Sequence, residues 1–563
     1  MTPAGRVALG AVPGGGAGAG TPPARRFPAL GLVLSAALLA VPAAAGATAC
    51  GGQHGGHGAG GTAMDGPGPL GRIEFPTSAG DEAQRHFLRG VLWLHSFEYE
   101  DARAAFHEAQ EAEPGFAMAV WGEAMTHNHP IWVQVDVEAG RAALEKLGET
   151  PEERLAAAPT ERERAYLAAV EELYFGDGDK AARDRAYAEA MDRLHRRWPD
   201  DREAASFRAL ALLGTCQGER DFAVYMEAAA VAEEVYLVNP EHPGALHYLI
   251  HSYDEAVHAP LGLRAARRYA EVASAAPHAL HMPSHIFLAL GLWDATEASN
   301  RDSWQASLDR GRPSYHALAW LHYALLQQGR FDEAAELLDL IAADVAEDRQ
   351  GARGHLASMA AAQAIATGPT SRGAVEALKA LESVESDGLY ADSAVAALFA
   401  KGYRAALAGD AAGARTAAAA IRDEAEGETG RSAGAAAISA DQLEALALLA
   451  DPGPGSDARM AGDAGGPAAE AALAMLRSAA DAEETLSLDI GPPHPVKPTA
   501  ELLGEVLMTL QRPSEAQAAF ERALELAPGR RLSVEGLADA ATFAGDAETA
   551  ADARGRLSAN TPR

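Results

Sequence analysis

The chain is short of cysteine, aromatic residues and positive charge. It has only two cysteines among 563 residues, Cys50 and Cys216. Because Cys50 stands where a leader would be cut, the mature chain would keep one thiol, which excludes a disulfide framework and a cysteine-based metal site. Any metal would therefore be held by histidine and carboxylate side chains. The aromatic content is 6% against 48% hydrophobic residues, and this alanine-rich balance favours many short packed helices over a β-rich core.

The shortage of basic residues also limits the partners. Lysine and arginine number 47 against 79 acidic residues, which gives a net charge of −32. We therefore expect no nucleic-acid partner, because the chain has no excess of phosphate-binding side chains. HExxH, P-loop and CxxC motifs are also missing. The usual zinc-protease, nucleotide-binding and iron–sulfur interpretations thus have no local support.

The first fifty residues have the pattern of a secretory leader. Arg25 and Arg26 precede an apolar run over residues 27–45, and small residues lead up to Cys50. This order predicts a leader over residues 1–50 and export to the periplasm or cell envelope. Cys50 is a candidate lipidation site and membrane anchor. Cleavage without a lipid is the alternative, because Ala47 stands where leucine is usual. We expect no other segment to be long and apolar enough to span a membrane.

A flexible glycine-rich linker is expected over residues 51–71, and an ordered, repetitive chain begins near residue 72. Small and large residues recur there at the offsets of a 34-residue helix–turn–helix unit. Small residues let two helices approach, a large residue fills the gap, and proline ends the second helix. The pattern is clearest in two places: Gly90, Ala102, Phe106, Ala109 and Pro114, and again Gly504, Ala516, Phe520, Ala523 and Pro528.

This pattern resembles the tetratricopeptide-repeat (TPR) superfamily over most of residues 80–560. The resemblance implies an all-α, right-handed superhelical solenoid of antiparallel helix pairs, whose first helices line a concave groove. The chain is also similar to a family of exported bacterial TPR proteins through HYLIHSYD (247–254) and HALHMPSH (278–285), a resemblance that implies no particular reaction. We expect three parts: a TPR-like array with the histidines over 72–345, an alanine-rich array over 346–490 with a loop near 451–467, and C-terminal repeats over 491–563.

A histidine stripe is the strongest functional signal. His247, His251, Asp254 and His258 recur at i, i+4, i+7 and i+11, so on a continuous helix they fall within a wedge of about 60°. The repeat register places the same residues on the groove-facing side of a first helix. Imidazoles and a carboxylate on one face can hold a metal or move protons.

Neighbouring segments add further histidines to this stripe. His127 and His129 are expected at the end of a first helix closed by Pro130, and Pro283 is expected to start the helix that carries His285. His278 and His281 are expected in the loop before it, and for His316 and His322 we favour packing roles. The predicted metal ligands are His247, His251, Asp254, His258, His281, His285, His127 and His129.

The sequence therefore predicts an exported TPR protein with a His/Asp metal site in the groove, which could be catalytic. Nitrogen and oxygen ligands admit a divalent Zn, Fe, Mn or Cu ion. Two alternatives stay open for the histidines: a polar packing network, and a groove that binds a peptide without metal. The second corresponds to a non-enzymatic scaffold for a peptide, protein or small-molecule partner in the cell envelope. Whether the histidines form one site or two is also open.

Overall fold

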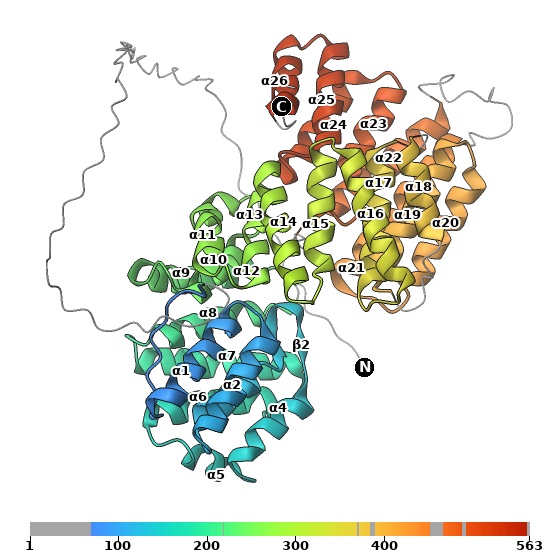
Figure 1. The fold of residues 1–563 in the computed structure, drawn as a ribbon. Coiled ribbons are helices and arrows are strands. Elements are labelled where there is room, and N and C mark those ends of the chain that lie inside the picture. The colour runs from blue at the N-terminus through green and yellow to red at the C-terminus, as the bar shows by residue number, and fades with distance from the viewer. Residues whose placement is uncertain are drawn as a thin grey trace, which may run out of the picture. The chain divides into compact units, whose positions relative to one another are not determined.

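The computed structural model describes residues 69–217, 219–368, 371–382, 389–450, 466–486 and 491–559. The predicted leader, Cys50, most of the predicted linker and most of the 451–467 loop lie outside these residues. Within them the chain is all-α, as predicted, apart from one short strand pair (Figure 1).

The helices follow one another with short connections. The first thirteen α-helices are α1 (Asp81–His95), α2 (Tyr99–Ala112), α3 (Ala117–Met125), α4 (Val137–Leu144), α5 (Pro151–Ala156), α6 (Glu161–Tyr174), α7 (Lys180–Arg197), α8 (Arg202–Gly214), α9 (Phe222–Val238), α10 (Pro243–Tyr253), α11 (Ala259–Val272), α12 (Pro277–His281) and α13 (Pro283–Ala289). The rest are α14 (Trp293–Asp309), α15 (Tyr315–Gln327), α16 (Phe331–Ala346), α17 (Ala352–Ala366), α18 (Arg372–Glu382), α19 (Ala391–Leu407), α20 (Ala411–Glu424), α21 (Gly430–Ala450), α22 (Pro467–Glu484), α23 (Thr499–Thr509), α24 (Pro513–Leu526), α25 (Arg531–Ala544) and α26 (Ala547–Ala559). Two 3₁₀ turns, Pro130–Trp132 and Glu145–Leu147, complete the helical elements.

Each helix packs mainly on its neighbours in sequence, which is the contact pattern of a helical solenoid. Helix α1 contacts α2 and α3, α17 contacts α18 and α19, and α23 contacts α24 and α25. A helix therefore pairs with the next one and touches the one after it, so the predicted solenoid of helix pairs is confirmed for the described residues.

The repeat pattern is visible in how glycine and phenylalanine meet. A Cβ atom added at Gly90 of α1 would lie 2.5 Å from the Phe106 ring, and one at Gly122 of α3 would lie closer still. Phe106 on α2 is thus held between two glycine-bearing helices. Phe520 on α24 lies in the same way between Gly504 of α23 and Gly536 of α25. These contacts are the physical basis of the predicted offsets, and the architecture is TPR-like.

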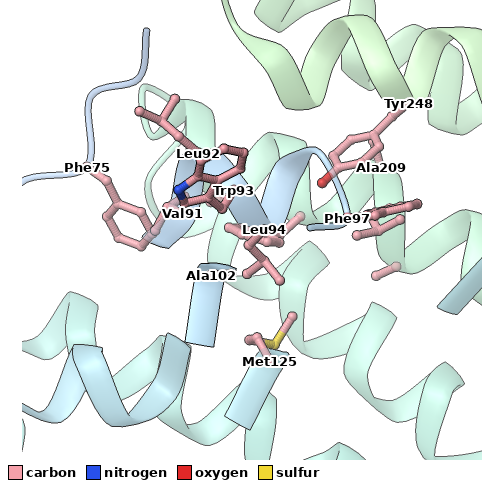
Figure 2. Packing of buried hydrophobic residues seen from close by; sticks show 14 of the residues in the cluster. Phe75, Val91, Leu92, Trp93, Leu94, Phe97, Ala102, Met125, Ala209 and Tyr248 are labelled. Carbon is pink, nitrogen blue, oxygen red and sulfur yellow. The ribbon is translucent and has the colours of Figure 1, made fainter. Parts of the chain in front are cut away.

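The core where α1 ends supports the candidate site. Leu94, Phe97, Met125 of α3 and Tyr248 of α10 are buried members of one hydrophobic cluster, in which the rings of Phe97 and Tyr248 lie 6.2 Å apart. Figure 2 shows Phe97 and Tyr248 side by side, with Leu94 and Met125 nearby. The N-terminal helix pair is therefore packed directly against the helix that carries the first two histidines of the stripe.

Helix α21 differs from what the sequence was expected to contain. With 21 residues it is long and apolar enough to cross a membrane by length and composition alone, although no such segment was expected after the leader. Of its most apolar stretch, 56% is buried, and the helix packs against α19, α20 and α22. A core helix passes the same length and composition test.

Candidate metal centre

The predicted stripe is interrupted because α10 ends at Tyr253. Asp254 leaves the helical conformation with ψ at 70°. The Glu255 carboxylate then accepts hydrogen bonds from the backbone N–H groups of Val257 and His258, at 2.6 and 2.7 Å. These local bonds replace those that a continuing helix would make. The continuous stripe through His258 is therefore wrong, and only His247 and His251 share the helix.

One histidine group, which we call the inner group, consists of His247, His251 and His278. A ligand nitrogen from each ring lies within 4.8 Å of the other two. The His247 Nδ1–H donates to the backbone carbonyl of His95 at 2.7 Å, so its Nε2 carries the lone pair. This Nε2 lies 3.1 Å from Nε2 of His251. His247 and His251 are 0% and 5% exposed.

The outer group consists of His281, His285 and His316, again with ligand atoms within 4.8 Å of one another. The Nε2 atoms of His281 and His285 lie 3.0 Å apart. His281 comes from the end of α12 and His285 from the first turn of α13. Pro283 begins α13, as predicted. His316, in the first turn of α15, is the exposed member of the group.

The proton positions in the outer group follow from its neighbours. The His285 Nδ1 lies 2.5 Å from Oδ2 of Asp254. The His281 Nδ1 lies 2.6 Å from Oδ1 of Asn300, whose Nδ2 donates to the Thr296 carbonyl at 2.8 Å. Because that carbonyl can only accept, the Asn300 oxygen must face His281. Both rings therefore carry their proton on Nδ1 and turn the lone pair of Nε2 toward each other.

Two facing lone pairs need something between them. A proton can fill the gap only if one ring becomes an imidazolium, whereas a metal ion uses both lone pairs directly. Zinc–nitrogen bonds of about 2.0–2.1 Å at tetrahedral angles place two nitrogens about 3.3 Å apart. The 3.0 Å separation in the outer group is close to this value, and this arrangement suits two ligands of one ion. In the inner group no neighbour fixes the proton of His251 on Nδ1, so its Nε2–H can also donate a hydrogen bond to Nε2 of His247 across the 3.1 Å gap.

Burial keeps these imidazoles neutral, which is the form that binds metal. Removal from water, followed by repulsion from neighbouring histidines, holds the pKa values of His247, His251, His278 and His281 well below 6.5. The low dielectric surroundings penalise the charged ring. Each ring therefore offers a lone pair at neutral pH.

The two groups lie next to each other and share aromatic walls. The ring centroids are 6.0 Å apart for His251 and His285, and 6.1 Å apart for His278 and His281. Phe97 lies 4.2 Å from His247, and Trp320 lies 4.4 Å from His285. The sequence left open whether there is one site or two, and the structure places two groups of three side by side.

A cleft of about 390 Å³ opens onto both groups. His278 of the inner group and His281 and His316 of the outer group line it, with Trp132 at 46% exposure. Arg310 and Arg312 also line it, but they pair with Asp101 and Glu100. Asp254 and His285 line a second cavity of about 160 Å³. Small molecules can therefore approach the histidines from solvent.

A third buried group, His95, Glu203 and His242, differs because its hydrogen bonds are complete. Glu203 lies 2.7 Å from His95 Nε2 and 3.0 Å from His242 Nε2. His242 Nδ1 accepts the Ala245 N–H at 3.1 Å, and His95 Nδ1 lies 2.8 Å from the Tyr248 hydroxyl. No ring nitrogen is left to bind a metal. The group is a structural network that fixes the end of α1 against α10.

The remaining predicted ligands lie outside the two groups. Asp254 contacts Nδ1 of His285, whereas Nε2 of His285 faces His281. Asp254 therefore supports a candidate ligand and is not itself a member of the group. His258 pairs with Glu255 and packs against Phe222. His129 belongs to β1 (Asn128–His129), which pairs antiparallel with β2 (Gln134–Val135), and stacks on Tyr99. His127 is half-buried in the turn after α3. The expected helix closed by Pro130 is wrong, because α3 already ends at Met125 and the residues just before Pro130 form β1.

The sequence prediction missed four residues that the structure brings into play. His278 was expected in a loop, but it lies on α12, and His316 was favoured as a packing residue. Asn300 and the His95 carbonyl hold ring nitrogens of two candidate ligands. The dense histidine spacing of HALHMPSH was a signal for His278. Nothing in the local sequence pointed to Asn300 or His95.

Comparisons with known proteins show similarity in fold only. No family model matches the chain, and no curated protein matches it in sequence. Among solved structures it is similar to yeast Tom70 at 12% identity and a TM-score of 0.35, covering 83% of this chain and 89% of that one. It is also similar to a human IFIT1 dimer with PPP-AAAA at 13% identity and a TM-score of 0.34, covering 86% and 91%. It is similar, too, to the Cut9–Hcn1 hetero-tetramer of the APC/C at 12% identity and a TM-score of 0.34, covering 81% of this chain and 76% of that one.

Proposed function

We propose that this protein is an exported, TPR-like metal-binding protein whose outer histidine group holds a divalent transition-metal ion. The observation that carries the proposal is the 3.0 Å approach of two Nε2 atoms whose Nδ1 atoms are both committed to acceptors. Second acceptors of this kind, and a carboxylate above all, orient metal-bound histidines and raise their basicity. Asp254 and Asn300 supply that support.

The chemistry of the proposed site follows from its ligand count. Three imidazoles leave one position open on a tetrahedral ion, which is the feature that separates catalytic from structural zinc sites. His281 and His316 line a cleft, so an ion held by them would be accessible to a small molecule. A bound water there would be acidified by the ion and could serve as a nucleophile. An enzymatic role therefore rests on the open position, and the reaction is unassigned.

The metal proposal is tested with zinc alone. Full-length protein is stripped with a chelator, dialysed against Zn(II) and analysed for bound metal. Wild type is expected to retain zinc, and His281→Ala and His285→Ala are expected to lose the zinc of the outer group. His258→Ala is the matched control, because His258 lies on the same segment but outside both groups. Absence of stoichiometric zinc in wild type would remove the proposal.

Export is proposed from the leader pattern of residues 1–50. Fractionation of cells that express the full chain would place the protein in the envelope fraction. If Cys50 is lipidated, Cys50→Ala releases the protein from membranes without changing its metal content. A protein that stays in the cytoplasmic fraction contradicts export but leaves the metal proposal intact.

A second candidate function is a scaffold that binds a peptide in the cleft. The observation that favours it is Trp132, which is 46% exposed at the cleft beside His278. Large aromatic residues of this kind anchor partners in binding grooves. Under this alternative, Trp132→Ala abolishes capture of the partner, whereas the double variant His281→Ala/His285→Ala leaves capture unchanged. Under the metal proposal, the double variant loses the zinc of the outer group, whereas Trp132→Ala keeps it.

A further inference from the structure

The inner histidine group differs from the group around Glu203 because its hydrogen bonds are incomplete. Around Glu203 every ring nitrogen has a partner. In the inner group, His251 Nδ1 and His278 Nε2 are buried and have no hydrogen-bond partner among the described residues. An unpaired buried polar atom is costly, and native proteins usually satisfy such atoms with an ion or a water molecule.

The hydrogen bonds of the inner group can be counted, because one proton is fixed. Nδ1 of His247 donates to the His95 carbonyl at 2.7 Å, so Nε2 of His247 must accept a hydrogen bond or bind an ion. Nε2 of His251, 3.1 Å away, can donate that hydrogen bond. The bond leaves His251 Nδ1 and His278 Nε2 as they are, without partners. Hydrogen bonds within the group therefore leave two buried nitrogens unsatisfied.

An ion accounts for more of these nitrogens than the hydrogen bond does. A ligand nitrogen from each of the three rings lies within 4.8 Å of the other two, and a small contraction brings them to the spacing of about 3.3 Å between the ligands of a tetrahedral zinc ion. An ion bound to Nε2 of His247, His251 and His278 leaves one unpartnered nitrogen in the group in place of two. We propose that the inner group binds a divalent transition-metal ion, in addition to the ion of the outer group.

His278 is held in place by contacts that do not involve an ion. Its backbone N–H donates to Glu98 at 3.0 Å. Its ring lies 5.0 Å from the ring of His247, edge to face, and 5.6 Å from the ring of Phe97. These contacts fix the His278 ring against the histidine pair of α10.

The inner ion would lie next to the outer one, and the pair rests on the function proposed for the outer group. No ring belongs to both groups, so each ion has three imidazole ligands of its own. The ring centroids of His251 and His285 are 6.0 Å apart, and those of His278 and His281 are 6.1 Å apart. His278, His281 and His316 line one cleft, so solvent molecules can reach ligands of both ions. The protein would thus carry a two-ion centre beside a common cleft.

The test counts zinc in the full chain and in variants of each group. Chelator-stripped protein is titrated with Zn(II) by calorimetry, and bound zinc is counted by elemental analysis after dialysis. Wild type is expected to bind two equivalents. The double variant His281→Ala/His285→Ala and the single variant His278→Ala are each expected to keep one, and the combined triple variant none. His258→Ala, outside both groups, is expected to keep two.

The outcomes separate this inference from the proposed function. One equivalent in wild type, lost in the double variant and kept in His278→Ala, would overturn the inner site and leave the outer one. The reverse pattern would overturn the outer site and support the inner one, and no bound zinc would overturn both. Zinc retained by the triple variant would place an ion elsewhere and overturn the inner assignment. Circular dichroism checks folding, and if His278→Ala does not fold, the equivalent kept by the double variant decides.

Discussion

The side-chain oxygen of Asn300 lies 2.6 Å from Nδ1 of His281, and the Asn300 amide nitrogen is held by the Thr296 carbonyl. This pair fixes one ring of the outer group through a residue that makes no contact with the proposed ion. The effect of Asn300 on metal binding can therefore be tested without replacing any proposed metal ligand.

Replacing Asn300 by alanine should weaken zinc binding by about 10–100-fold, the usual cost of losing a second acceptor behind a metal ligand. Asn300→Asp keeps an acceptor and adds charge, so it should bind zinc at least as tightly as wild type. Competition titration against a chromophoric chelator measures both. If Asn300→Ala binds like wild type, the amide does not position His281.

Proton release from the imidazole rings on metal binding should be small at neutral pH. A ring with an ordinary pKa of 6.5 is protonated in about one molecule in four at pH 7 and must lose that proton to bind. Burial holds the pKa values of His281 and the inner histidines well below this range, so these rings are already neutral. Calorimetry in buffers of different ionisation enthalpy counts the protons. Because a metal-bound water can add up to one proton to this count, only release above one proton per ion would contradict the neutral-ring picture.

His322 should make the metal-free protein less stable in acid. Burial lowers its pKa to about 4 against 6.5 in the unfolded chain. Between these values the unfolded state binds more protons than the folded state, so stability is full above pH 6.5 and falls as the pH drops toward 4. The loss is at most about 3 kcal/mol. His322→Gln should flatten this part of the pH profile in chelator-treated denaturation experiments. If stability falls equally steeply with pH in the wild type and in His322→Gln, His322 does not contribute to the loss of stability in acid.

Gly122→Ala should destabilise the N-terminal repeat. The added methyl would collide with the Phe106 ring, and overpacking of this kind costs about 1–3 kcal/mol. Gly555→Ala on α26 is the matched control, because no atom lies within 4 Å of the added Cβ. That change should be neutral or stabilise by up to about 1 kcal/mol through helix propensity. Thermal unfolding followed by circular dichroism should show a lower melting temperature for Gly122→Ala and an unchanged or higher one for Gly555→Ala, and an unchanged melting temperature for Gly122→Ala would contradict the close packing.

The buried ion cluster of the C-terminal repeats should be sensitive to loss of one partner. Arg530 donates two hydrogen bonds to Glu501, at 2.7 and 2.9 Å, and the pair is almost fully buried. Arg530→Met leaves this carboxylate less compensated and should cost about 3–5 kcal/mol. Arg422→Met removes an exposed pair with Asp441 and should cost at most about 1 kcal/mol. Denaturant titration of both variants measures the two losses of stability. Equal losses would contradict the expected difference between the buried and the exposed ion pair.

The sequence predicted the fold well because the repeat architecture depends on the spacing of residues that are close together in the chain. The glycine and phenylalanine offsets around Phe106 and Phe520 describe contacts between consecutive helices, and these contacts form as expected. The i, i+4 pair His247/His251 was also recognisable, since its members lie on consecutive turns of α10. His281 was expected in a loop, but it lies at the end of α12 and its Nε2 meets Nε2 of His285.

The rest of the site depends on where helices stop and on distant neighbours. Helical periodicity alone could not show that α10 ends at Tyr253, and this end moves Asp254 behind His285 and His258 out of the group. His316 joins through the packing of α15 against the segment before it. Such contacts depend on tertiary packing and produce no periodic pattern in the sequence.

The hydrogen bond from His247 to the His95 carbonyl joins residues 152 positions apart in a chain whose other contacts are mostly between neighbours. A ribosome or a translocation channel releases α1 long before it releases α10, and the outer group stays incomplete until His316 has followed. If the proposed ion is bound, it can therefore be loaded only late in the synthesis and folding of the polypeptide. In an exported chain that crosses the membrane unfolded, the ions would have to be acquired at the destination, and the metal supply of that compartment would decide what the site contains.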